Sequence, residues 1–503
     1  MRKRLPIFYS ALLLTGVNLL LRLAGTTFQV YLSGKIGAEG VGLLQLVLSV
    51  GGLSMTAAMA GIRTTAMNLT AEELGKNRPE NVGCVLQGCF LYSILCSTTV
   101  SLLLFWFSPV IAEKWIGDPQ SLGAIRLVAL FLPVVCLTGC MSGYFTAANR
   151  IGTLAAVEVA EQICSMAVTM TALTLWARED PGKACQAVIL GSSTGALLTF
   201  VCLGILRKKE TAQPSNRIPV RKRLLSTAVP QALADDLKAG ISTAENLMVP
   251  KRLALYPSST APLAVFGTVC GMVFPVLMFP ACILYGLADL LIPELARCNA
   301  AGSHIRIRYL ARRSLRVALV YGIACGGVLF LLADGLCLGL YRNETAGEYL
   351  RWFALLAPML YCDAIIDAMN KGLGQQKICV RYNIFTSFLD VAFLFFLLPR
   401  YGMKGYFFSF FVTHLINAGL SLKLLLKNTG LKIPLRVPVT ALGSLMLAVL
   451  LTERIGNPAF KTGVFLAAVL GLLYGSGILY KEDAIWLRQL WRIGKNTEKK
   501  QIK

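Results

Sequence analysis

The chain has 503 residues, of which 55% are hydrophobic and 15% charged, and its mean hydropathy is +0.63. A soluble globular protein carries about a quarter charged residues, so this composition excludes a water-soluble fold and predicts that most of the chain lies in lipid. The net charge of +23 would suggest nucleic-acid binding in a soluble protein. Here the basic residues lie between apolar runs, without a basic stripe interleaved with aromatics, so we expect no nucleic-acid partner.

The N-terminus begins with Met1-Arg2-Lys3-Arg4, and an apolar run follows it to about Tyr31. This run is longer than the apolar region of a signal peptide, and no small-residue cleavage site closes it. We therefore expect an uncleaved first helix.

Fourteen apolar stretches are long enough to span a bilayer as helices. They cover residues 7–31, 41–69, 82–109, 122–147, 151–176, 184–206, 224–249, 262–292, 315–340, 348–370, 379–399, 404–426, 434–452 and 461–480. The predicted fold class is thus an all-α integral membrane protein.

Basic residues between the stretches set the orientation. With the N-terminus inside, about 32 Lys and Arg face the cytoplasm and about 12 face outward, which predicts cytoplasmic termini by the positive-inside rule. In the tail, the spacing of Ile485, Leu487, Leu490 and Trp491 predicts a short amphipathic helix on the membrane surface.

The sequence also carries a weak internal repeat at an offset of about 225 residues. Gly42 aligns with Gly267, Gly61 with Gly286, and Pro133 with Pro358. Each copy holds an even number of spans, so the copies must share one orientation, as in transporters with parallel repeats. We expect two six-helix lobes and two additional helices.

The expected division of the chain follows from this repeat. It consists of an N-lobe (1–206), a basic cytoplasmic linker (207–223), a C-lobe (224–427), two additional transmembrane helices (428–480) and a basic cytoplasmic tail (481–503).

Three cations stand out by their depth inside predicted spans, where a charge costs about 3 kcal/mol and indicates function. Arg22 lies near the middle of the first span, Lys238 near the middle of the seventh, and Arg63 about two turns from the cytoplasmic end of the second. Cations facing one cavity suit an anionic substrate such as a phosphate or pyrophosphate, so we predict that these three bind substrate. Arg63 could instead extend to the interface, as we expect of Arg126 near an outer end.

Acidic residues also occur within spans. Some could couple transport to an ion or proton gradient, and others could pair with cations across helices; the candidates for either role are Glu158, Asp236, Asp363, Asp367 and Asp390.

No catalytic motif is present: the chain has no Walker loop, no Gly-x-Ser-x-Gly and no His-Glu-x-x-His. Fifteen cysteines are scattered without metal-ligand spacing, and there are only two histidines. We expect no metal, no cofactor and no enzyme activity. A membrane-embedded transferase using Asp363 and Asp367 remains an alternative.

The chain resembles the polysaccharide biosynthesis and export branch of the MATE-like superfamily, a group that includes the stage V sporulation B proteins and the lipid II flippases. The segments that carry the resemblance are Leu19-Leu20-Leu21-Arg22, Lys35 to Gly42, Val249-Pro250-Lys251-Arg252-Leu253, Lys371-Gly372-Leu373-Gly374-Gln375 and Tyr480-Lys481-Glu482-Asp483. The resemblance implies two six-helix lobes around a central cationic cavity that binds a pyrophosphate, and a groove for the polyprenyl tail by the added helices. Arg22, Arg63 and Lys238 match such a lining by type and approximate place.

Together these features predict a flippase or exporter of a lipid-linked saccharide, such as a peptidoglycan or polysaccharide precursor, in the cell membrane. The expected partners are a lipid-linked oligosaccharide or polyprenyl-pyrophosphate substrate, membrane lipids and cell-wall synthesis proteins. One alternative is a MATE-type, cation-coupled multidrug antiporter, although the first two spans carry Arg22 and Arg63 and no acid. Another is a membrane scaffold, for which charges within the spans would be dispensable.

Overall fold

The structure is a computed structural model in which residues 7–76, 78, 80–176, 180–208, 220–258, 260–431, 436–452 and 455–477 are described. All their regular structure is helical. Most of the predicted linker and the whole predicted tail, with its amphipathic helix, lie outside these residues.

The chain divides by its internal contacts into two compact units. Unit 1 comprises Met1–Phe279, Leu340–Arg342 and Ile384–Thr413, and unit 2 comprises Pro280–Gly339, Asn343–Asn383 and His414–Lys503. Unit 1 holds all of the predicted N-lobe together with parts of the predicted C-lobe, so the division into lobes stays a prediction.

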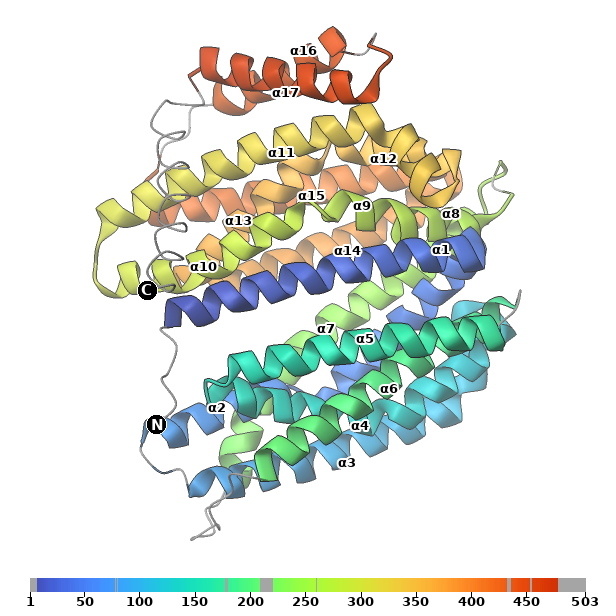
Figure 1. The fold of residues 1–503 in the computed structure, drawn as a ribbon, viewed down its shortest axis with the longest axis vertical. Coiled ribbons are helices and arrows are strands. Elements are labelled where there is room, and N and C mark those ends of the chain that lie inside the picture. Colours follow the sequence, from blue (N-terminus) through green and yellow to red (C-terminus); the bar gives the residue numbers. More distant parts are fainter. Residues whose placement is uncertain are drawn as a thin grey trace, which may run out of the picture. The chain divides into compact units, whose positions relative to one another are not determined.

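Unit 1 contains α1 (Ile7–Met59), α2 (Ile62–Gly75), α3 (Asn81–Val110), the π-helix η1 (Ile111–Ile116), the 3-10 helix η2 (Pro119–Ser121), α4 (Leu122–Ala147), α5 (Ile151–Leu175), α6 (Pro181–Lys208), α7 (Val220–Leu253), α8 (Pro262–Thr268), the π-helix η3 (Val269–Val273) and α9 (Phe274–Met278). Most of α14 (Gln376–Tyr401) and the first part of α15 (Met403–Thr429) also belong to it. Within this unit α3 packs on α4, and α6 packs on both α4 and α5 (Figure 1).

Unit 2 contains α10 (Ala281–Ala300), almost all of α11 (His304–Tyr341), α12 (Glu344–Ala354), α13 (Ala357–Gly372), the remainder of α14 and α15, α16 (Arg436–Thr452) and α17 (Pro458–Gly475). The two additional helices pack on α11: Phe465 and Val469 of α17 and Ala441 and Leu445 of α16 form one core with Ile323. They are thus integrated into unit 2.

Over its described residues, every predicted span coincides with one helix or with several consecutive helices. Among the described residues, nine helical stretches are long and apolar enough to cross a membrane, or up to eleven if each bent pair is one span. One stretch, Leu19–Gly75, contains two predicted spans, because α1 runs through Gly37, whose non-helical φ of 69° breaks it. The remaining two predicted spans correspond to α7, which carries several charges, and α16, which is only 17 residues long. Fourteen spans are consistent with this count.

Several spans are interrupted rather than continuous. The predicted span 262–292 is divided among α8, η3, α9 and α10, with Pro280 directly before α10. The span 348–370 is divided into α12 and α13, which are bent by 56°, and Pro358 lies in the first turn of α13. Proline lacks the backbone N–H and collides with the preceding turn, so both breaks follow from the sequence.

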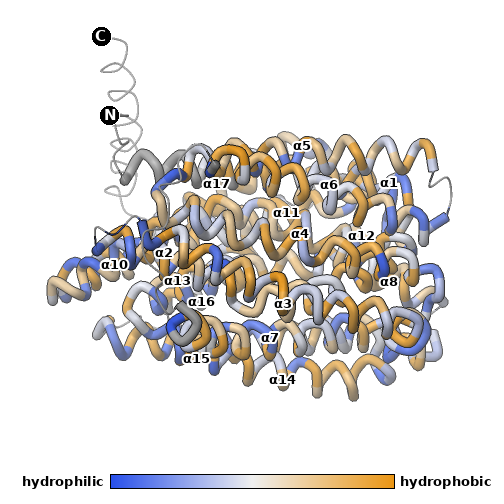
Figure 2. Tube along the Cα trace, turned by 90° about the horizontal axis from the view of Figure 1, so that it is seen from below, coloured by the Kyte–Doolittle hydropathy of each residue, from blue (hydrophilic) through white to orange (hydrophobic). Residues whose placement is uncertain are grey.

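The surface of the helices is apolar. On α3, Leu91 is 72% exposed, Leu102 70% and Trp106 81%, and Figure 2 shows that this helix is hydrophobic over most of its length. Such a surface is unfavourable in water and suits hydrocarbon. The chain is a multi-pass membrane protein.

The two glycines that the repeat aligns touch each other. A Cβ built on Gly267 would lie 2.9 Å from the Cα of Gly42 and would meet the carbonyl oxygen of Ala38, while a Cβ built on Gly42 would lie 3.2 Å from the carbonyl carbon of Leu263 and would meet its oxygen. Ala38 and Leu263 are themselves 225 positions apart, so the contact is reciprocal, as at a two-fold interface. This symmetry supports the proposed repeat.

Candidate functional site

The three predicted substrate cations all lie in unit 1, Arg22 on α1, Arg63 on α2 and Lys238 on α7. All three side chains are exposed on the surface of the unit rather than buried in its core. A charged side chain on an otherwise apolar span faces either lipid or a wet space between helices, and lipid is the costly choice. That they line one cavity stays a prediction.

The depth of Lys238 follows from contacts of α7 with α1 and with Gly61, which lies just after α1. A Cβ on Gly61 would lie 2.8 Å from the carbonyl oxygen of Ala228, and farther along α7 the Thr243 hydroxyl donates to the carbonyl oxygen of Ser49 at 3.0 Å. The helices therefore run antiparallel, and Lys238 lies between these two contact levels. At 1.5 Å per residue, it lies roughly 15 Å along α7 from Ala228, well inside the span.

Arg63 occupies a crowded position where α2 crosses α4. Its carbonyl oxygen would lie 2.5 Å from a Cβ on Gly143, so only glycine permits this approach of the two backbones. The guanidinium interacts electrostatically with Glu158 on α5. Arg63 and Glu158, predicted separately from the sequence, are thus brought together.

Arg126 has local partners on the neighbouring helix. Its Nε donates to the hydroxyl of Ser108 at 3.3 Å, and its guanidinium lies 5.3 Å from the centre of the Phe105 ring. Both partners belong to α3. This arginine is accounted for by packing and serves as a control for the others.

Asp363 and Asp367 share one face of α13 but have different surroundings. Asp367 forms an ion pair with Lys371, one turn away, at an N···O distance of 2.6 Å. Asp363 accepts a hydrogen bond from the Asn417 amide at 3.1 Å, while its other oxygen is buried and has no hydrogen-bond partner among the described residues. Asp367 is therefore neutralised by a neighbouring charge, and Asp363 is not.

Asp390 forms a buried carboxyl pair with Glu245. Asp390 is only 6% exposed, and its Oδ1 accepts from the Ser409 hydroxyl at 2.5 Å and from Thr413 at 3.2 Å. Its carboxyl group interacts electrostatically with that of Glu245 on α7. Two carboxyl groups that lie this close without a basic neighbour are unusual inside a membrane span.

The sequence analysis gave no reason to pair these two acids, because they are 145 positions apart. Asp236, the remaining predicted acid, lies beside Asp235 on α7 and within electrostatic range of Tyr92. Among the described residues no group of three or more His, Cys, Asp or Glu side chains could hold a metal ion.

A second unforeseen cluster joins the end of α2 to the beginning of α7. Arg223 donates from Nη1 to Glu73 and from Nη2 to Glu72, each at 2.8 Å, and Asn81 donates to the second oxygen of Glu73 at 3.0 Å. The hydrogen bonds that Arg223 donates, first to Glu73 and then to Glu72, raise the pKa of its guanidinium. The cluster links the two predicted repeats at the predicted cytoplasmic end.

Comparison with known proteins identifies chains that are similar in sequence and in fold. Residues 15–171, which are less than half of the chain, match the MatE family model. Stage V sporulation protein B of Bacillus subtilis (strain 168) is 21% identical over 406 residues, covering 78% of each chain.

Two groups of solved structures share this architecture. A lipid II flippase in an inward closed conformation aligns with 95% of this chain and 99% of its own at a TM-score of 0.68 and 12% identity. An inward-facing multidrug resistance MATE transporter aligns with 85% of this chain and 99% of its own at a TM-score of 0.64 and 12% identity. The resemblance predicted from the sequence is confirmed, and the chain has the fold of these transporters and flippases.

Proposed function

We propose that this protein moves a lipid-linked saccharide, with its phosphate or pyrophosphate, from the inner to the outer leaflet of the cell membrane by alternating access. The observation that carries the proposal is the exposure of Arg22, Arg63 and Lys238 on membrane spans of one unit. A phosphate crossing hydrocarbon needs cations part-way, and each of these side chains would otherwise face lipid at a cost of about 3 kcal/mol. The cargo class would be a peptidoglycan or polysaccharide precursor, and both termini would be cytoplasmic.

The Gly42–Gly267 contact supports the alternating-access part. At the predicted outer end, α1 and α8 cross with their backbones in direct contact, and this contact joins the two predicted repeats. Rocking of the repeats would have to separate this contact to release cargo outward. The Arg223 cluster lies at the opposite end of the spans and would have to adapt when that end opens and closes.

The test is flipping by the full chain in proteoliposomes with a fluorescent polyprenyl-pyrophosphate saccharide. Arg22→Ala and Lys238→Ala should each reduce the flipping rate by roughly tenfold or more, since one charge-assisted hydrogen bond in a dry site is worth about 1.5–3 kcal/mol. Lys238→Arg, which keeps the charge, should retain most of the rate.

Arg126→Ala is the matched control, because it removes a span cation that already has partners on α3. It should flip as the unmodified protein does. Flipping no faster than in empty vesicles, or full activity of Arg22→Ala and Lys238→Ala, would refute the proposal.

The buried Glu245–Asp390 pair favours a second candidate, a cation-coupled antiporter of small molecules. A carboxyl pair that holds a proton can exchange it for a cation when its surroundings open. Glu245→Gln and Asp390→Asn should remove gradient dependence, whereas Asp367→Asn, whose native carboxylate pairs with Lys371, should not. Drug efflux that depends on this pair, without movement of labelled lipid, would select the antiporter.

A further inference from the structure

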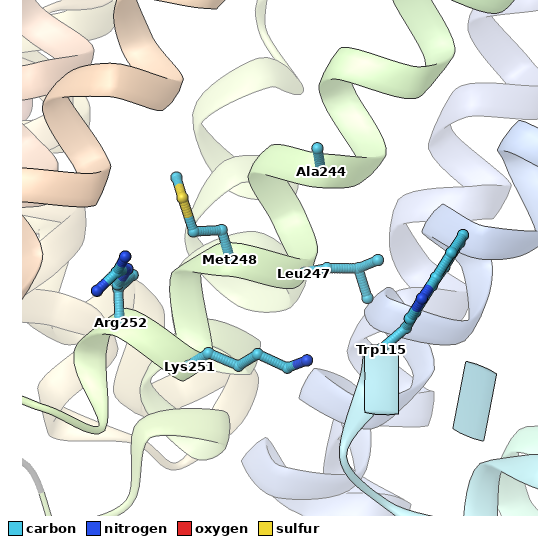
Figure 3. A pocket seen from close by; sticks show the side chains of 6 residues that line it. All are labelled: Trp115, Ala244, Leu247, Met248, Lys251 and Arg252. Carbon is cyan, nitrogen blue, oxygen red and sulfur yellow. The ribbon is translucent and has the colours of Figure 1, made fainter. Parts of the chain in front are cut away.

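A cavity of about 300 Å³ lies along one face of the last two turns of α7. Its lining consists of Trp115 from η1 and of Ala244, Leu247, Met248, Lys251 and Arg252 from α7 (Figure 3). The α7 residues are spaced by three, four, seven and eight positions, which places them on a single helical face. All belong to unit 1.

The cavity changes character along the helix. Ala244, Leu247 and Met248 come first and are uncharged, and the two cations follow in the last turn. From Ala244 to Arg252 the helix rises about 12 Å. Figure 3 shows Leu247 and Lys251 directed toward the Trp115 ring, and tryptophan is typical of the boundary between hydrocarbon and headgroups. The apolar part thus lies deeper in the span and the cationic part at the predicted outer boundary.

Both cations are held in place by neighbouring groups. The Lys251 ammonium donates to the carbonyl oxygen of Lys114, and the Arg252 guanidinium lies 3.2 Å from the centre of the Phe395 ring. Lysine keeps two more donors, and an arginine stacked on a ring keeps its in-plane N–H groups for an anion. Among the described residues no salt bridge involves either side chain, so the two positive charges that line the cavity are not paired with an acid.

We propose that this cavity binds the phosphate headgroup of a lipid, with the phosphate between Lys251 and Arg252 and the start of the hydrocarbon chain along Met248, Leu247 and Ala244. A cation whose side chain merely extends to the aqueous interface needs no cavity, and it needs no aromatic ring or carbonyl oxygen to hold it in one position. Hydrocarbon followed by a phosphate ester matches the order of groups along this face. The lipid could be a phospholipid of the bilayer or a polyprenyl phosphate of the cargo class.

The site is distinct from the three substrate cations, and its test measures binding rather than transport. The full chain in detergent is labelled with three photoreactive probes of similar chain length: phosphatidylglycerol, polyprenyl phosphate and phosphatidylcholine. Labelled peptides are located by mass spectrometry. Labelling of η1 and the end of α7 is expected from at least one of the two anionic probes and should exceed that from phosphatidylcholine.

Loss of both charges in Lys251→Gln/Arg252→Gln should lower this labelling roughly tenfold, the effect of about 1.4 kcal/mol. The swapped pair Lys251→Arg/Arg252→Lys should keep it. Lys404→Gln is the matched control, because Lys404 is an exposed cation at the beginning of α15 in the same region of unit 1. Its neighbour Gly402 packs against Tyr256, which follows α7: a Cβ on Gly402 would lie 2.9 Å from the tyrosine ring.

The outcomes separate the possible ligands. Preferential labelling by phosphatidylglycerol identifies a bilayer lipid, and preferential labelling by polyprenyl phosphate identifies the cargo class. Equal labelling by all three probes, or labelling that the charge-removing variant does not change, overturns the proposal. Should the double variant not elute as folded protein, Lys251→Gln and Arg252→Gln alone are each expected to lose part of the labelling, and no loss in either overturns it too.

Discussion

The reciprocal contact of Gly42 and Gly267 gives the sharpest prediction about how the protein moves. In Gly267→Ala the added Cβ would lie 2.5 Å from the amide nitrogen and 2.9 Å from the Cα of Gly42. These are backbone atoms, which cannot turn aside as a flexible side chain can, so the two helices must separate. Overpacking of this kind costs about 1–3 kcal/mol. The equilibrium constant between the arrangement with the helices in contact and the arrangement with them apart should therefore shift roughly 5- to 150-fold toward separation.

Hydrogen exchange of the full chain in lipid nanodiscs measures this shift. Peptides covering residues 36–44 and 262–270 should exchange faster in Gly267→Ala, and because the contact is reciprocal, Gly42→Ala should have the same effect on both peptides. Gly34→Ala is the matched control, since Gly34 lies nearby on α1 and a Cβ there would meet nothing within 4 Å.

Two results would contradict the reasoning. Exchange in Gly267→Ala that equals exchange in Gly34→Ala would mean that the contact does not hold this end closed. Faster exchange throughout the chain, with a lower melting temperature, would mean that the glycines serve folding and not movement.

Three further predictions concern the other clusters. Arg223→Gln removes the Arg223–Glu73 pair and should lower the free energy of unfolding by about 1 kcal/mol, with a smaller decrease in high salt. If the effects of Arg223→Gln and Glu73→Gln were strictly additive in a double-mutant cycle, the pair would contribute nothing. Arg63→Gln should slow flipping. If Arg63 served only to pair with Glu158, the double variant Arg63→Gln/Glu158→Gln would regain the flipping rate of the unmodified protein, and we expect that it does not. At Gly327 a Cβ would meet an aromatic ring of α17, so Gly327→Leu should speed hydrogen exchange in residues 458–475, and unchanged exchange there would argue against this packing.

Much of the fold was predictable because the solvent is lipid. Backbone groups cannot remain unpaired in hydrocarbon, so the length of each apolar stretch predicts a helix, and all fourteen stretches coincide with helices. The breaks at Pro280 and Pro358 also follow from local chemistry, since proline removes a backbone donor wherever it stands.

The candidate sites show what local sequence cannot decide. Arg22, Arg63 and Lys238 could be selected because a charge within an apolar stretch is costly whatever surrounds it. The pairing of Asp367 with Lys371, one turn away, follows from helical spacing. Packing alone decided that Asp390 lies beside an acid 145 positions distant.

The sequence by itself determined that this is a multi-pass helical membrane protein with charged residues inside its apolar stretches, because hydropathy and helix length act over a few turns. Tertiary structure alone decided the partners of those charges, the crossing of the aligned glycines and the cavity at the end of α7. Contacts between distant helices depend on how side chains of many spans interlock, and no local pattern encodes that fit.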